Sequence, residues 1–95
     1  MLIKVATEFK DDFTTRQAGE RLRNIILTSK EKIVVDFNQV IVASASFFDE
    51  AFAKLAHEGW SSEKINQQIS IENIFSRDLD LLRQTCKIRG FQWKH

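Results

Sequence analysis

Residues 33–52 read IVVDFNQVIVASASFFDEAF and contain the clearest signals of secondary structure in the chain. The stretch opens with IVVDF, residues 33–37, a nearly continuous apolar run of strand length that is rich in β-branched side chains. A run of this kind suits a strand that is covered on both faces, as strands of parallel sheets are. We therefore predict a buried strand over residues 33–37, and Asp36 near its end is expected to hydrogen-bond to amides of the following turn.

The second half of the stretch predicts a helix. Its apolar residues recur at spacings of three and four: Phe48, Ala51, Phe52, Leu55 and Ala56. Such spacing places side chains on one face, so this helix is expected to pack in the core. The hydroxyl of Ser46 is expected to cap its first turn, where Asp49 and Glu50 would complement the helix dipole. Gly59 suits the left-handed position after the last turn, and residues 60–62 are predicted as a turn.

The same two patterns continue on both sides of this centre. Residues 2–6 and 69–74 predict strands, the second of which alternates apolar and polar residues as a half-buried strand does. Residues 14–29 predict an amphipathic helix that begins with a capping box at Thr14, and a last helix is predicted from the cap residue Ser76 onward. The order β-α-β-α-β-α predicts the α/β class, with a small mixed or mostly parallel sheet of three to four strands packed by about three helices.

Length and composition limit the classes of function. The 95 residues are 43% hydrophobic and 28% charged with a net charge of +1, which predicts one domain, residues 1–95, without an overall field that would attract nucleic acid or anionic lipid. A single cysteine excludes an intramolecular disulfide and a cysteine-based zinc site. No apolar run approaches the ~20 residues that span a bilayer, and the apolar start is too short for a signal peptide, so we expect a cytoplasmic protein without a membrane partner. The sequence has no Walker loop, GxGxxG or HExxH motif, and we expect neither a cofactor nor a metal.

Residues 35–52 carry three features in order. These are a strand that ends in Asp36-Phe37, a short apolar turn, and Ser46-Phe47-x-x-Glu50-x-Phe52 at the start of a helix. Together they resemble the centre of the STAS-like domains of unknown function, small bacterial and phage-borne relatives of the anti-sigma factor antagonists. Weaker similarities extend the resemblance to about residues 9–85: Gly19-x-x-Leu22-Arg23 and Ile71-x-Asn73.

The resemblance implies a non-enzymatic regulatory module for protein–protein interaction. In the anti-sigma factor antagonists the turn reads Asp-Ser-Ser-Gly, and a partner that is both kinase and anti-sigma factor phosphorylates the second serine. That serine falls on Ser46, whereas Ser44, Ala45 and Phe47 depart from the other three positions. The resemblance therefore implies a protein partner, such as a histidine-kinase-type ATPase or an anti-sigma factor, and phosphorylation at Ser46 or, by proximity, at Ser44.

The turn and the exposed face of the following helix are expected to bind this partner. The residues of that surface are Ser46, Phe47, Asp49 and Glu50. Each has a structural alternative: a helix cap for Ser46, core packing for Phe47, and dipole complements for the two acids. Because neighbours on a helix differ in direction by about 100°, Phe47 and Phe48 cannot both face the core squarely, and the two alternatives for Phe47 stay equally open.

A basic C-terminal segment supplies an alternative function, that of a small nucleic-acid-binding factor. Its cations are Arg83, Lys87, Arg89 and Lys94, interleaved with Phe91 and Trp93. Basic residues with interleaved aromatics bind single-stranded nucleic acid. We favour the opposite interpretation, in which the cations complement a helix end and the aromatics pack onto the domain, so nucleic acid is not the expected partner.

An enzyme is the least favoured interpretation. Asp36, His57 or the Asp49-Glu50 pair would carry the chemistry, but no nucleophile or base stands at a recognisable spacing from them. Cys86 falls on an apolar stripe and is predicted to be buried, and His57 is predicted on a solvated helix face. The sequence leaves the oligomeric state open, although an exposed Phe or Trp would favour a homodimer.

Overall fold

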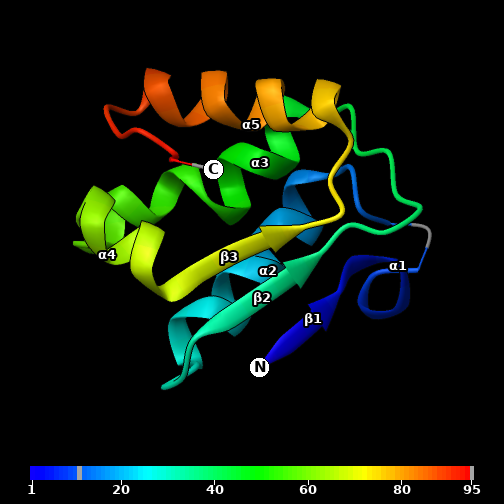
Figure 1. Ribbon diagram of the computed structural model, residues 1–95, viewed down its shortest axis with the longest axis horizontal. Coiled ribbons are helices and arrows are strands. Elements are labelled where there is room, and N and C mark those ends of the chain that lie inside the picture. Colours follow the sequence, from blue (N-terminus) through cyan, green and yellow to red (C-terminus); the bar gives the residue numbers. More distant parts are fainter. Residues whose placement is uncertain (11, 95) are drawn as a thin grey trace.

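In the computed structural model, which describes residues 1–10 and 12–94, three parallel strands form one sheet (Figure 1). The strands β1 (Leu2–Lys4), β2 (Ile33–Asp36) and β3 (Ile69–Glu72) lie in the order β1-β2-β3, with β2 in the centre. In the register, Val35 of β2 lies between Ile3 of β1 and Ile71 of β3. The predicted α/β class with a small parallel sheet is confirmed.

Helices make up the rest of the fold. They are α1 (Val5–Glu8), α2 (Arg16–Thr28), α3 (Ala45–Ala51), the 3-10 helix η1 (Ala53–Glu58), α4 (Ser62–Gln68) and α5 (Ser76–Ile88). The helix expected to run toward Gly59 is divided, because the backbone of Phe52 leaves the helical region at φ −120° and ψ −49°. Gly59 itself takes the expected left-handed conformation, with φ 84°. Residues 5 and 6, predicted in a strand, belong to α1 instead.

The helix α4 corrects a second prediction, since its first residue was expected in a turn. The side chain of Ser61 accepts a hydrogen bond from the amide of Lys64 at 3.1 Å and thereby caps this helix. Only Ile65 of α4 is fully buried. A single buried residue leaves no periodic apolar stripe in the sequence, so the helix could not be recognised from spacing.

Two other caps lie one residue away from their predicted positions. Thr15, and not Thr14, caps α2 by accepting a hydrogen bond from the amide of Ala18 at 3.1 Å. Ser76 is the first residue of α5, and Phe75 holds the cap position without a side-chain hydrogen bond. Both errors arise because the backbone conformation, which the sequence does not reveal, decides which of two adjacent residues is the last extended one.

Helices cover one face of the sheet. On the face toward them, Ile71 is half-buried and the other residues are buried: Ile3, Ile33, Val35 and Ile69. Those that point the other way are exposed or half-buried: Leu2, Lys4, Val34, Asp36, Ser70 and Glu72. In Figure 1, α2 passes behind the sheet while the front of the strands is uncovered. The prediction that residues 33–37 are covered on both faces is therefore wrong for the described chain.

The strand order explains this arrangement. Connections between parallel strands are right-handed, so each step along the sheet places its helix on a face fixed by the direction of the step. The order β1-β2-β3 means that both steps run in the same direction. The helices of both connections therefore lie on one side, and the described elements form two layers.

The core lies where α3 meets its neighbours. Every residue of α3 from Phe47 to Ala51 is buried. The helix α2 approaches it closely at Gly19, where an added Cβ would lie 2.6 Å from the carbonyl oxygen of Phe47 and 2.8 Å from the Cβ of Glu50. A glycine within a helix lowers stability by about 1 kcal/mol relative to alanine. Glycine is found at this position because a side chain would prevent the close approach of the two backbones.

Candidate functional site

The structure places three of the four predicted partner-binding residues in the interior. Phe47 has no exposed surface, and its ring makes edge contacts with Phe9 and Phe48 at centroid distances of 6.2 and 5.8 Å. Asp49 and Glu50 are only 8% and 7% exposed. The expectation that these side chains form an exposed helix face is therefore wrong, because α2 and α5 pack against α3, and of the two alternatives for Phe47 core packing is the one found.

The two acids of α3 form an ion-pair network among the described residues. Glu50 accepts hydrogen bonds from Arg16 and Arg23 of α2, both at 3.0 Å. It also accepts one from Lys54 of η1 at 2.7 Å. Asp49 binds Arg89 through two parallel hydrogen bonds of 2.8 Å, and Arg16 reaches it at 3.2 Å.

These ion pairs determine the charge state of the acids. Burial alone would raise the pKa of Glu50, but hydrogen bonds from Lys54, Arg23 and Arg16 outweigh it and lower the pKa from 4.5 to about 2. The Arg89 guanidinium holds the pKa of Asp49 below its ordinary value, against the opposing effect of burial. Both groups are therefore ionised at neutral pH and join α2, η1 and the end of α5 to α3, which is a structural role.

Asp78 holds the loop between β2 and α3, although its position in the sequence predicts only a place in the last helix. Asp78 is 3% exposed, and its carboxylate accepts hydrogen bonds from the amides of Val42 at 2.7 Å and Ala43 at 2.9 Å. Ala43 has a left-handed backbone with φ 49°, a conformation that costs a residue with a Cβ about 1–2 kcal/mol. Asp78 thus holds a strained loop, and no local pattern links two positions that lie 35 residues apart.

Ser44, and not Ser46, caps α3. The backbone of Ser44 is still extended, and its hydroxyl accepts a hydrogen bond from the amide of Phe47 at 3.3 Å while donating one to the carbonyl oxygen of Thr14. Ser46 lies within the first turn of α3 and is half-buried. The cap role predicted for Ser46 is therefore wrong. Phosphorylation of either hydroxyl stays a prediction.

Asp36 ends its strand in the way that the sequence analysis favoured. One carboxylate oxygen accepts hydrogen bonds from the amide of Asn38 and from the side chain of Asn73, both at 2.9 Å. The hydrogen bond from Asn73, followed by that from Asn38, lowers the pKa of this carboxyl group. Asn73 also has a left-handed backbone, with φ 58°. The ends of β2 and β3 are thereby joined beside the loop that precedes α3.

A groove of about 540 Å³ lies at this end of the molecule, between the loop and the start of α5. We call it the strand-end groove; its lining residues are Ile41, Ala43, Phe75, Ser76, Arg77, Asp78, Asp80, Leu81 and Gln84. Ile41 is 65% exposed and Phe75 is 49% exposed. A single exposed apolar side chain needs no explanation, but two that lie in one groove do.

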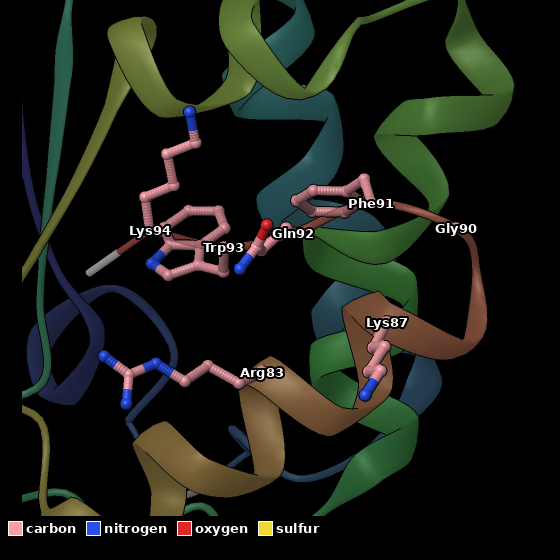
Figure 2. A pocket seen from close by; sticks show the side chains of 7 residues that line it. All are labelled: Arg83, Lys87, Gly90, Phe91, Gln92, Trp93 and Lys94. Atoms are coloured by element: carbon pink, nitrogen blue, oxygen red, sulfur yellow. The ribbon is translucent and has the colours of Figure 1, made fainter.

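The four cations of the predicted nucleic-acid site do not act together. Arg89 is occupied by Asp49, whereas Arg83, Lys87 and Lys94 line a separate cleft of about 850 Å³ beside the C-terminal segment (Figure 2). We call it the tail cleft; Gly90, Phe91, Gln92 and Trp93 complete its lining. The aromatic residues Phe91 and Trp93 are 5% and 3% exposed, as expected for side chains that pack onto the domain.

Cys86 and His57 are the remaining candidates for catalysis. Cys86 is buried, and burial raises the pKa of its thiol to about 12. His57 is exposed, as predicted, and its Nε2 lies 3.4 Å from Arg89. In residues 1–10 and 12–94, no group of three or more His, Cys, Asp or Glu side chains is placed to hold a metal ion. None of the helices in the same ranges has the length and apolar character needed to cross a membrane.

Comparison with known proteins identifies one family. A family model described as a STAS-like domain of unknown function matches residues 18–78, from α2 to the start of α5. The matched range includes β2, the loop held by Asp78 and the whole of α3. No curated protein and no solved structure matches the chain.

Proposed function

This chain belongs to the STAS-like domains of unknown function, and from that premise we propose that it is a non-enzymatic regulatory module that binds a protein partner through the strand-end groove. The observation that carries the proposal is the exposure of Ile41 and Phe75 on the two sides of this groove. Exposed apolar side chains that gather in one place mark interaction sites, and aromatic anchors that enter a partner's pocket supply much of the binding energy.

The position of the groove also supports the proposal. Its lining residue Ala43 directly precedes Ser44, the cap of α3, and Ser46 follows within the first turn. A phosphate on either serine would add about 1.5–2 negative charges beside the groove, where a docked partner would be affected by them. Because Asp49 and Glu50 are ion-paired, they would oppose this added charge less than two free carboxylates would.

The partner that we propose is a histidine-kinase-type ATPase or an anti-sigma factor, as the family resemblance implies. Its contact surface would present apolar side chains to Ile41 and Phe75. The buried residues Phe47, Asp49 and Glu50 would contribute by keeping α3 and its preceding loop in place. Docking through the strand-end groove thus replaces docking through the face of α3.

Binding to a purified partner tests this proposal. Candidate ATPases recovered from the source cells by affinity capture would be purified and titrated with the wild-type chain and with an Ile41→Ser/Phe75→Ser variant. We expect the variant to bind at least about tenfold more weakly, since loss of two apolar anchors costs more than about 1.4 kcal/mol. Mass spectrometry of the captured chain would locate any phosphate on Ser44 or Ser46.

Ile88→Ser is the matched control. Ile88 is 85% exposed on α5 and does not line the groove, so its substitution removes a comparable apolar surface elsewhere. Equal affinity of the wild-type chain and the groove variant for the purified partner would refute docking at this site. An equal loss of affinity in Ile88→Ser would show that general surface hydrophobicity, and not the groove, determines binding.

A further inference from the structure

The C-terminal segment has a fixed path beside α5. The amide of Phe91 donates a hydrogen bond to the carbonyl oxygen of Cys86 at 3.2 Å, and the amide of Gly90 donates one to that of Lys87 at 3.0 Å. This pair of bonds ends α5 in a Schellman motif, and Gly90 supplies the left-handed residue with φ 87°. The chain therefore reverses direction at Gly90 and runs back along the helix.

Contacts farther along hold the segment against the rest of the domain. The side chain of Asn66 in α4 donates to the carbonyl oxygen of Gln92 at 3.0 Å and accepts from the amide of Lys94 at 2.9 Å. The indole of Trp93 packs edge-on against Phe52 at a centroid distance of 5.6 Å. The cleft beside this segment therefore has two walls, α5 on one side and the C-terminal segment on the other.

The charge of the tail cleft has one sign. Arg83 and Lys87 project from α5, and Lys94 lies at the far end of the opposite wall (Figure 2). None of the described residues that line the cleft is acidic. The helix dipole accounts for Lys87, which lies in the last turn of α5, but not for Arg83 or Lys94. Asp49, which neutralises the neighbouring Arg89, does not line the cleft.

The remaining lining is the C-terminal segment itself. Phe91 and Trp93 are almost fully buried, and the side chain of Gln92 lies between their rings in Figure 2. The volume of about 850 Å³ falls in the range of sites that take small organic ligands. A cationic cleft of this volume suits a ligand that combines a phosphate with an organic part, since guanidinium groups bind phosphate oxygens in a bidentate manner.

We propose that the tail cleft binds a small organic phosphate of nucleotide size, with Arg83 and Lys87 on the phosphate and the organic part along the wall formed by residues 90–94. This site is independent of the strand-end groove, which lies near the other end of α5. It gives the chain a place to sense a metabolite while a protein partner occupies the groove.

Isothermal titration of the full chain with adenosine diphosphate tests the site, with amide chemical shifts locating the contact. We expect saturable binding, shifts at Arg83, Lys87 and Gln92, and affinity that is weakened at least about tenfold in an Arg83→Gln/Lys87→Gln variant, because each charged hydrogen bond contributes more than a neutral one. The control is Lys30→Gln/Lys32→Gln, which removes the same charge from exposed residues outside the cleft. Matching urea midpoints of all three proteins would establish that the variants are folded.

Other ligands distinguish the sources of affinity. If adenosine binds as tightly as adenosine diphosphate, the phosphate has no role in binding. If inorganic phosphate binds as tightly as adenosine diphosphate, the organic part has none. Unchanged affinity in Arg83→Gln/Lys87→Gln would overturn the site itself. Binding of an oligothymidylate without any binding of adenosine diphosphate would assign the cleft to nucleic acid and overturn the proposal.

Discussion

Replacing Glu50 by glutamine should destabilise the protein in a way that depends on pH. The side chain is buried between α2, α3 and η1, and it accepts hydrogen bonds from Arg16, Arg23 and Lys54. Glutamine keeps the volume but removes the negative charge. The three cations would then share a neutral amide, and Arg23, whose side chain is only 13% exposed, would lose its ionic partner.

Two arguments give the magnitude. A fall of the pKa from 4.5 to about 2 corresponds to about 3.5 kcal/mol of stability at neutral pH, at about 1.4 kcal/mol per unit. Removing one member of a buried ion pair costs about 3–5 kcal/mol. The side chain of Arg16 is 55% exposed and water screens its share, so we expect the lower end, roughly 2–3 kcal/mol.

The sign of the pH dependence follows from the direction of the pKa shift. The carboxyl group of Glu50 has a lower pKa in the folded chain than in the unfolded chain, so its contribution is fully present above pH 4.5. It is lost as the pH falls from 4.5 toward 2, because protonation then accompanies unfolding. Asp49 is present in both proteins, so the comparison of wild type with Glu50→Gln isolates the contribution of Glu50.

Urea denaturation at a series of pH values measures this difference. The free energies of unfolding of wild type and variant should differ by roughly 2–3 kcal/mol at pH 7, and this difference should shrink as the pH falls from 4.5 toward 2. Glu20→Gln removes an exposed carboxylate from α2 and should change stability by less than about 0.5 kcal/mol. A difference for Glu50→Gln that is below about 0.5 kcal/mol at pH 7, or that is constant from pH 7 to 3, would refute the assigned network.

Four further outcomes are expected. Gly19→Ala should lower the free energy of unfolding in urea by about 1–3 kcal/mol through its clash with α3, and a stabilised variant would contradict the close approach. Asp78→Ala should cost about 2–4 kcal/mol in the same assay, since it leaves two amides of the loop without their acceptor, whereas exposed Asp80→Ala should cost far less. Ser44→Ala should lower the thermal midpoint by an amount equivalent to about 1 kcal/mol, while an equal or larger loss in Ser46→Ala would return the cap to that residue. Cys86 should react with a thiol reagent only as fast as the chain unfolds, and rapid labelling of the native protein would contradict its burial.

Local patterns in the sequence are enough to predict the class of fold and the order of its main elements. The apolar run at residues 33–37, the alternation at residues 69–74 and the helical spacing around Phe48 are local patterns, and each follows from the period of its own secondary structure. The motif around Ser46 and Phe47 was specific enough to indicate the family. The burial of Cys86 and the turn at Asp36 were also predictable, because both depend on neighbours in the chain.

Tertiary packing determines which of these side chains are exposed. Asp49 and Glu50 look like solvated acids in the sequence, and only the arrival of α2 and α5 on either side of α3 buries them with their arginines. The same holds for Asp78, which binds a loop 35 residues away. Exposure and long-range hydrogen bonds arise from the packing of distant segments, and no local period encodes that packing. The candidate sites at the strand-end groove and the tail cleft therefore became visible only once the chain was folded.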